Sequence, residues 1–584
     1  MMRLTRLIAL ALMVLLIANS ISTNAMVKED SPDNYPINTV FTTADSNLII
    51  DGNLELEDLG LPGNGTSEFP FILANQRYSS LDDNIIVQNT DLHLLIENCS
   101  IQGYDGQNIG IGFDNVSNIV VSNVSFSGKD TGIVCNNAMN IRIDNCSFEN
   151  CYSSGFYFSD SINLTVFHST FRSIGEWAMV TPTGGAPYRT ITGLVGRVRN
   201  SENITVENNE CVKLERAHTC FSFVNCHNLV FNNNSVDTVA VALYMYDCTG
   251  VTFCYNDFEA TSFRIYDDPE SVFTRVTSNF VDGKNLGIFL REENLVIYGE
   301  SLVSATLIKC KNITIIGGTF MEVDIQMGLW SCINCSFQNV EVFGAEYFMI
   351  DVGSFVMENS MGCSISSSTV NRSLGIHSCL DSTIINCIFN YASTTVCAIY
   401  LDNSTQTRCI NNRILNCDGG IYVFNSYYTA ITGNWIELAV SNGISVSNSR
   451  HGSISNNSVL GSGDNGIVLE GGSSRFNITR NVFGWNHYSN AVDHGSSNFW
   501  DDGISRGNNY SDYSGSGIYH IDGDAASIDH YPSGISPGYW DPSLVEDPLD
   551  SIVGVLILIG VVAVGATISV YIWNGLAQKR EMNL

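Results

Sequence analysis

The sequence is short of positive charge. Lysine and arginine number 27 against 59 aspartates and glutamates, which gives a net charge of −32, although charged residues make up only 15% of the chain. Binding to nucleic acid needs a basic stripe, and an acidic surface repels the phosphate backbone. The composition therefore excludes nucleic acid as a partner and predicts a solvated, outward-facing surface.

Metal-binding cysteine pairs are lacking as well. The chain has 18 cysteines, but Cys332-x-x-Cys335 has no second pair at the distance of a zinc site. The ten histidines and 13 methionines are scattered, which argues against a copper site. Other cysteines, such as Cys99, Cys146 and Cys387, recur at one position of a repeat. This pattern predicts columns of small buried hydrophobic side chains, with a few disulfides allowed.

Leucines at fixed positions and helical segments, which a leucine-rich horseshoe needs, are missing too. What recurs instead is a nine-residue phrase, which runs from Asn118 to Phe126 and again from Asn140 to Phe148. Most successive copies lie 22 to 25 residues apart. A fixed period of this size indicates stacked structural repeats.

Each phrase alternates apolar and polar residues, as a short strand does. In one copy the apolar positions are Ile141, Ile143, Cys146 and Phe148, and another short strand precedes each phrase. Two or three such strands with tight turns make one turn of a parallel β-helix, and the turns stack about 4.8 Å apart. A propeller blade would need about 40 residues. We therefore predict an all-β, parallel β-helix solenoid.

The two ends of the chain carry hydrophobic segments. Residues 1–25 have the basic start, apolar run and small residues of a secretory signal peptide. Residues 552–573 are 22 residues without charge, enough to cross a bilayer, and Lys579 and Arg580 follow them. This arrangement predicts a single-pass protein of the cell membrane, with its bulk outside and its C-terminal tail in the cytoplasm.

The predicted layout divides the chain into seven parts. These are a signal peptide at 1–25, a leader and N-terminal cover at 26–84, the β-helix at 85–485, a C-terminal cover at 486–532, a stalk at 533–551, the membrane helix at 552–573 and a tail at 574–584.

Arginine and aromatic residues fall into two outward columns when the strands are aligned on their terminal Asn or Asp (Asp160, Asn200, Asn225, Asp247, Asp267). One column reads Tyr157, Arg197, Ser222, Tyr244, Arg264, and the next reads Ser159, Arg199, Val224, Tyr246, Tyr266. Aromatic faces stack on sugar rings, and guanidinium groups form paired bonds to carboxylates. We expect a saccharide-binding face here, overhung by a loop that carries Glu176 and Trp177. The alternative is that these ladders only stabilise stacked strands.

Asparagine is abundant in the repeat, and fifteen Asn-x-Ser/Thr sequons occur. The glycosylation candidates are Asn64, Asn98, Asn115, Asn163, Asn403 and Asn477. Because the repeat itself demands Asn, some of these side chains are expected to stack inward as hydrogen-bonded ladders. A weaker signal, Asp522 and Asp524 with Asp529, suggests calcium in the C-terminal cover.

Several segments resemble the NosD-type right-handed parallel β-helix proteins over roughly residues 46–532. The resemblance rests on Gly63–Thr66, Asn279–Lys284, Asn312–Thr314 and the run from Trp500 to Pro532. It is nearest to the membrane-anchored surface proteins of archaea that are built on this repeat. The resemblance implies a single-stranded right-handed solenoid with a cover at each end. It does not fix a function, since the repeat occurs in carbohydrate-binding proteins, sugar hydrolases and a copper-maturation factor.

Catalytic patterns are incomplete. A polygalacturonase-like site needs Asn-Thr-Asp, Asp-Asp and His-Gly on neighbouring turns, so that two carboxylates flank the glycosidic oxygen. Only Asn89–Asp91 is present there, and Asp493–Gly495 and Asp501-Asp502 lie in the C-terminal cover. We therefore predict no catalytic residue and a surface protein that binds carbohydrate or a neighbouring surface protein. A polysaccharide hydrolase or lyase, and a structural spacer of the cell envelope, remain as alternatives.

Overall fold

The structure is a computed structural model of the whole chain. The residues that it describes are 42–44, 47–79, 82–103, 108–180, 188–214, 217, 219–237, 241–259, 262–265, 269–321, 327–343, 355–371, 373–390, 397–536 and 539–540. The predicted signal peptide, membrane helix and tail lie outside these residues, as do much of the leader and most of the stalk. No helix among the described residues has both the length and the apolar character needed to cross a membrane.

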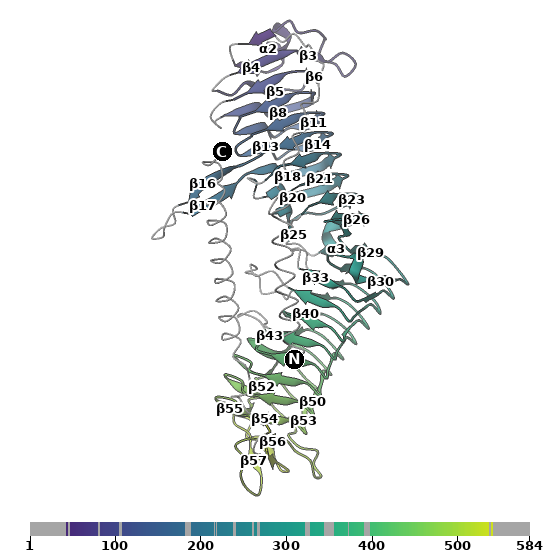
Figure 1. Ribbon diagram of the computed structural model, residues 1–584, viewed down its shortest axis with the longest axis vertical. Helices are drawn as coiled ribbons and strands as arrows, with labels where there is room; N and C mark the ends of the chain where they lie inside the picture. The colour runs from purple at the N-terminus through teal and green to yellow at the C-terminus, as the bar shows by residue number, and fades with distance from the viewer. Residues whose placement is uncertain are drawn as a thin grey trace, which may run out of the picture. The chain divides into compact units, whose positions relative to one another are not determined.

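The described residues from 43 onwards form an all-β parallel solenoid of about 18 turns (Figure 1). Successive coils pair in parallel, as the alternation predicts. For example, β11 (Met139–Asp144) pairs with β14 (Ile162–Phe167), which places Ile141 beside Leu164. Both side chains are buried. The predicted solenoid fold is therefore confirmed.

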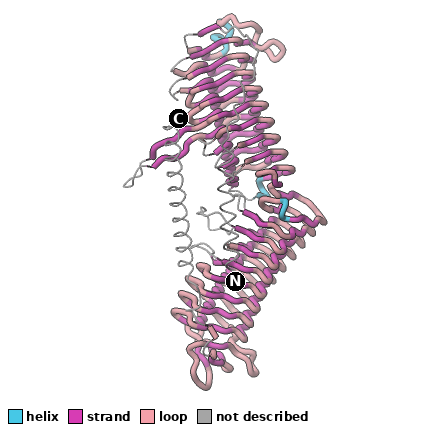
Figure 2. Tube along the Cα trace, viewed as in Figure 1, coloured by secondary structure: helices cyan, strands magenta, loops and turns pink. Residues whose placement is uncertain are grey.

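The coils fall into two groups with different sheets. The first group builds an 11-stranded and a 15-stranded sheet, in which β8 (Ile109–Ser122), β18 (Leu194–Glu207) and β20 (Thr219–Asn232) run unbroken along two sides of a coil. From β29 (Ile288–Leu290) to β59 (Ser533–Gly534), three sheets of 10, 9 and 10 strands follow. Figure 2 shows strands alternating with loops through both groups.

The interior holds two clusters of buried hydrophobic residues. The first extends from Ile50 to Ile308 and the second from Leu302 to Ile521. In the first, the Phe148 ring lies 4.7 Å from that of Phe126 and 4.8 Å from that of Phe171. The rings sit at the same position of successive coils, so the repeat produces the stack.

The cysteines behave as the repeat predicts. All of the 18 cysteines are buried except Cys397, which is half-buried. Burial raises the pKa of Cys146 to about 12, so the thiol stays neutral and packs like a small apolar side chain.

Asparagine ladders run along the solenoid, both inside and outside. Inside, each side-chain amide donates to the Oδ1 of the Asn one coil further on, over 2.9–3.0 Å (Asn412, Asn434, Asn457, Asn481, Asn508). Outside, an equivalent ladder links Asn118, Asn140, Asn163, Asn203 and Asn228. The expected inward ladders are thus present, and they satisfy polar groups that the core would otherwise leave without partners.

The N-terminal cover is a short helix over the first coil. β2 (Leu48–Asp51) pairs with β5 (Ile85–Thr90), and α2 (Asn53–Asp58) buries Leu56. β3 (Phe71–Ala74) already pairs in parallel within the stack. Among the described residues, coil pairing therefore starts before residue 85, and the helix with the segment after it lies at the N-terminal end of the stack.

The interruption between residues 172 and 194 is a hairpin rather than the loop that the sequence predicts. β16 (Glu176–Val180) and β17 (Tyr188–Thr192) pair antiparallel, and in Figure 1 they project from the side of the coils. The hairpin leaves the stack immediately before β18.

Buried carboxylates hold the C-terminal cover together. Both oxygens of Asp493 accept hydrogen bonds, from the backbone N–H of Gly495 (2.8 Å), the Asn498 amide (2.9 Å), the Trp500 indole (3.0 Å) and the Ser527 hydroxyl (2.7 Å). Asp493 is fully buried. The Asp493-His494-Gly495 segment is therefore an organising element of the cover.

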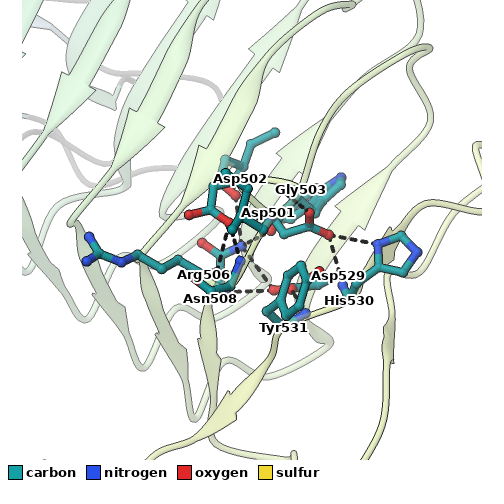
Figure 3. Close-up of polar contacts among 12 residues, drawn as sticks. Asp501, Asp502, Gly503, Arg506, Asn508, Asp529, His530 and Tyr531 are labelled. Atoms are coloured by element: carbon teal, nitrogen blue, oxygen red, sulfur yellow. Dashed lines mark hydrogen bonds and ion pairs between the residues drawn. The ribbon is translucent and has the colours of Figure 1, made fainter.

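Asp529, drawn in Figure 3, is a second buried carboxylate of this cover. Asp529 accepts hydrogen bonds from the backbone N–H of Asn508 (2.7 Å) and of Tyr531 (2.9 Å), while His530 pairs with Asp501 over 2.8 Å. The acidic residues of this cover thus serve its own structure.

The chain then turns back along the solenoid. Trp540 donates its indole N–H to Glu437 (2.7 Å) and lies 5.4 Å from the Trp485 ring, while the Tyr539 hydroxyl is 3.1 Å from that of Ser458. We call Tyr539 and Trp540 the strap. The predicted stalk therefore begins as a segment fixed to the coils.

Candidate functional site

The two predicted columns of arginine and aromatic residues exist in the predicted register. On adjacent strands, Tyr157 lies beside Arg197, Arg197 beside Ser222, and Ser222 beside Tyr244. The strands are β13 (Ser154–Ser159), β18, β20 and β22 (Val241–Tyr246). In the second column, Ser159, Arg199, Val224 and Tyr246 follow one another in the same way.

Asparagine sets this register. Asn200 and Asn225, directly after the columns, have φ angles of +48° and +52°, which Asn tolerates better than most residues. Their amides continue a ladder in which Asn225 donates to Asn200 over 3.1 Å and Asn200 donates to Asp160 over 3.1 Å. The backbone of each coil therefore bends at the same height, and every second side chain before the bend faces outward.

A groove of about 350 Å³ lies on these columns, and we call it the arginine groove. It is lined by Gly193, Leu194, Arg197, Arg199, Thr219, Ser222, Val224 and Tyr244. Gly193 and Leu194 follow the hairpin directly, so the base of the hairpin forms one edge of the groove.

The two arginines of the groove carry charge without compensation. Both side chains are half-buried, and their Nε atoms are buried without a hydrogen-bond partner. Within the part of the chain that the structure describes, no carboxylate pairs with either guanidinium group. Burial, with the nearby charge of Arg199, lowers the pKa of Arg197 below its usual value. The groove is thus a site of concentrated positive charge on an acidic protein.

The other residues of the predicted saccharide-binding face are not among the described lining of the arginine groove. Tyr246 is 52% exposed at the end of its strand, and the Arg264 backbone in β25 (Ser262–Ile265) lies beside Tyr244. Trp177 belongs to the hairpin strand β16. Tyr266 lies outside the described residues. The groove therefore holds Arg197, Arg199 and Tyr244 of the predicted set, with Tyr157 on the adjoining strand.

The three predicted calcium ligands are not brought together. Asp522 accepts a hydrogen bond from Ser489 (2.8 Å), Asp524 pairs with His494 (3.1 Å), and Asp529 is buried among its own donors. Over the described residues, no group of three or more Asp, Glu, His or Cys side chains is arranged to hold a metal ion.

The glycosylation candidates occupy different environments. Asn98, Asn115 and Asn163 are members of outer ladders, and Asn403 donates to Ser378. Asn64 accepts hydrogen bonds from Thr66, and Asn477 is exposed in β53 (Asn477–Thr479). Modification of these residues stays a prediction.

Asn89–Asp91, the partial polygalacturonase-like motif, lines a separate groove of about 410 Å³ with Asn115, Asn137 and Asp160. The Asp91 carboxylate accepts a hydrogen bond from the Asn53 amide over 2.8 Å, and Asn89 donates to Asp51 over 2.7 Å. These bonds tie the motif to the first coil and its cover.

Comparison with known proteins identifies two regions of the sequence. Residues 311–515 match the NosD family, described as periplasmic copper-binding protein, and residues 61–187 match the right-handed beta helix region. No curated protein matches the sequence.

Similar solved structures include three proteins. The surface adhesin PfbA of Streptococcus pneumoniae has 15% identity and a TM-score of 0.24, covering 67% of this chain and 91% of PfbA. DFA-IIIase of Arthrobacter chlorophenolicus A6 has 10% identity and a TM-score of 0.25, and the match covers 59% of this chain and 81% of DFA-IIIase. The periplasmic alginate epimerase AlgG has 9% identity and a TM-score of 0.21, and the match covers 80% of this chain and 85% of AlgG. Similarity this low carries no information about function. The chain is therefore a parallel β-helix protein, of which residues 311–515 are similar to the NosD family and residues 61–187 to the right-handed beta helix region.

Proposed function

We propose that the protein recognises an acidic saccharide in the arginine groove and does not transform it. The observation that supports this proposal is the pair Arg197 and Arg199, which share a groove of about 350 Å³ and have no carboxylate partner among the described residues. A ligand that brings carboxylates would compensate both charges.

The chemistry of the groove fits a uronate unit. A guanidinium group presents a planar fork that matches a carboxylate with two parallel hydrogen bonds. The Nε atoms of both arginines are buried without a hydrogen-bond partner, so we expect the terminal nitrogens of each guanidinium group to bind the carboxylate. Tyr244 adds an aromatic face, against which a sugar ring packs.

Catalysis is not part of the proposal. Glycoside hydrolysis needs two carboxyl groups across the scissile bond, and the described lining of the arginine groove contains none. A lyase would release an unsaturated product, which absorbs ultraviolet light. Ultraviolet absorbance, recorded during the binding test described below, would therefore detect lyase activity.

We further propose that the protein works at the cell surface, held by the segment 552–573 with the solenoid outside. Its hydrophobic ends and acidic composition support this location. A neighbouring surface protein is the alternative ligand, and a spacer without a ligand is the second alternative.

The test measures binding of the full-length protein to polygalacturonate and to neutral dextran. We expect binding to the polyuronate alone, and a loss of at least tenfold in Arg197→Gln/Arg199→Gln. Arg408→Gln is the matched control, since Arg408 is exposed and pairs with Asp381 over 2.8 Å. Equal binding of dextran, product release, or an unchanged double variant would contradict the proposal.

A further inference from the structure

A second groove, of about 440 Å³, lies on the 10-stranded sheet of the second group of coils that begins with β29. We call it the tyrosine groove. It crosses β43 (Cys397–Asp402), β46 (Gly419–Phe424) and β49 (Ile444–Ser447), and its lining includes Tyr400, Tyr422, Asp418 and Glu470. The function proposed above does not use it.

Two tyrosines form one wall of the groove. Tyr400 and Tyr422 lie side by side on adjacent strands, with ring centroids 5.5 Å apart and planes 36° from parallel. Both side chains are half-buried, so each ring keeps a face toward the groove. Gly419 and Gly420 add backbone without side chains to the lining. Flat aromatic faces suit a ring-shaped ligand.

Two carboxylates in the groove indicate that a positively charged ligand is favoured. Asp418 and Glu470 line the groove, and neither carboxylate forms an ion pair or a side-chain hydrogen bond with the described residues. Burial and the nearby charge of Asp464 raise the pKa of Asp418 above its usual value. A neutral ligand would leave this negative charge uncompensated, whereas a cation would relieve it.

The cation is better an ammonium group than a metal ion. Calcium takes six to eight oxygen ligands, and no cluster of three or more metal-binding side chains occurs in the described residues. An ammonium group is attracted both to carboxylates and to the faces of aromatic rings. We propose that the tyrosine groove binds an amino sugar, whose ring stacks on Tyr400 and Tyr422 while its free amine pairs with Asp418 and Glu470.

The experiment uses the full-length protein and a tetrasaccharide of glucosamine with free amines. We expect binding by calorimetry at low ionic strength, and at least tenfold weaker binding of the fully N-acetylated tetrasaccharide, which has the same rings without charge. Asp418→Asn/Glu470→Gln should weaken binding of the free amine at least tenfold. Tyr400→Ala/Tyr422→Ala tests the stacking, and circular dichroism confirms that each variant is folded.

Non-specific attraction to an acidic protein needs its own control. Glu57→Gln/Asp58→Asn removes the same charge from the exposed α2 helix, and it should leave binding unchanged. The proposal is overturned if this control weakens binding as much, if the acetylated sugar binds equally well, if tetralysine binds as tightly, or if no binding occurs.

Discussion

At the scale of single residues, the buried carboxylates of the C-terminal cover are the most sensitive points. Replacing Asp493 with alanine leaves four donors without an acceptor, among them the Trp500 indole. We expect a loss of about 3 kcal/mol in the free energy of unfolding of the cover, because only the Trp500 indole among these donors is fully buried and one unsatisfied buried donor costs about 1–3 kcal/mol. Chemical denaturation measures this loss. Asp524→Asn, whose side chain is 93% exposed, should change stability little.

Asp501 predicts how the cover responds to acid. Burial raises its pKa, but hydrogen bonds from the backbone and ring of His530 and from the Gly503 N–H outweigh burial and lower the pKa below the usual 3.8. The unfolded chain therefore takes up the proton first as the pH falls. The stabilisation is present above pH 3.8 and is lost below it. Fluorescence of buried Trp500 should report this transition, and Asp501→Asn should weaken it. A transition that is identical in the variant would contradict this account.

At the scale of repeated elements, the inner asparagine ladder stabilises the coils more than the outer ladder does. Asn457 is buried, donates to Ile431 O (2.8 Å) and Asn481 (2.9 Å), and accepts from Asn434 (2.9 Å). Asn457→Ala should lower the free energy of unfolding by about 3 kcal/mol. The exposed Asn137, which donates to Asn115 over 3.1 Å, is the control, and Asn137→Ala should cost less than about 1 kcal/mol.

The elements also show what a sequence can predict. Alignment on the shared Asn or Asp places Tyr157, Arg197 and Tyr244 correctly, because each Asn or Asp adopts a left-handed backbone angle that bends the coil at the same point. The groove itself cannot be predicted this way, since its volume depends on how Gly193 and Leu194 leave the hairpin.

The hairpin and the tyrosine groove could not be predicted from the sequence, for two different reasons. Residues 176–192 have no copy elsewhere in the chain, so the repeat gives no template for β16 and β17. Tyr400 and Tyr422 do occupy the same repeat position, which is a usable signal. Asp418 and Glu470 lie outside the strand pattern, however, and only the folded coils bring them to one groove.

At the scale of the whole molecule, the two hydrophobic clusters predict separable unfolding. Neighbouring coils contact mainly each other, so a solenoid loses stability locally. Phe148→Ala removes a ring stacked between two others, and we expect a cost of about 3–5 kcal/mol. Hydrogen exchange should rise in the coils around residue 148 and stay unchanged around residues 420–480. Equal loss of protection in both groups would show that they unfold together.

The strap predicts where the chain resists proteolysis. Trp540→Ala removes the hydrogen bond to Glu437 and the contact with Trp485. We expect faster cleavage between residues 535 and 541, with an unchanged midpoint of solenoid denaturation, measured by limited proteolysis and mass spectrometry. Tyr488→Ala, which changes a 72% exposed ring outside the strap, should leave the cleavage rate unchanged.

The strap also determines how the protein bears mechanical load. A pull on the chain beyond residue 540 reaches Trp540 and Tyr539 before it reaches the coils, because these two side chains fasten the chain to Glu437 and Ser458. We expect such a force to release these two anchors first, because each coil is held by a ladder of backbone hydrogen bonds to its neighbours whereas the strap is held by few contacts. We therefore expect the strap to detach before any coil unfolds, so that both grooves stay folded while the protein is under tension.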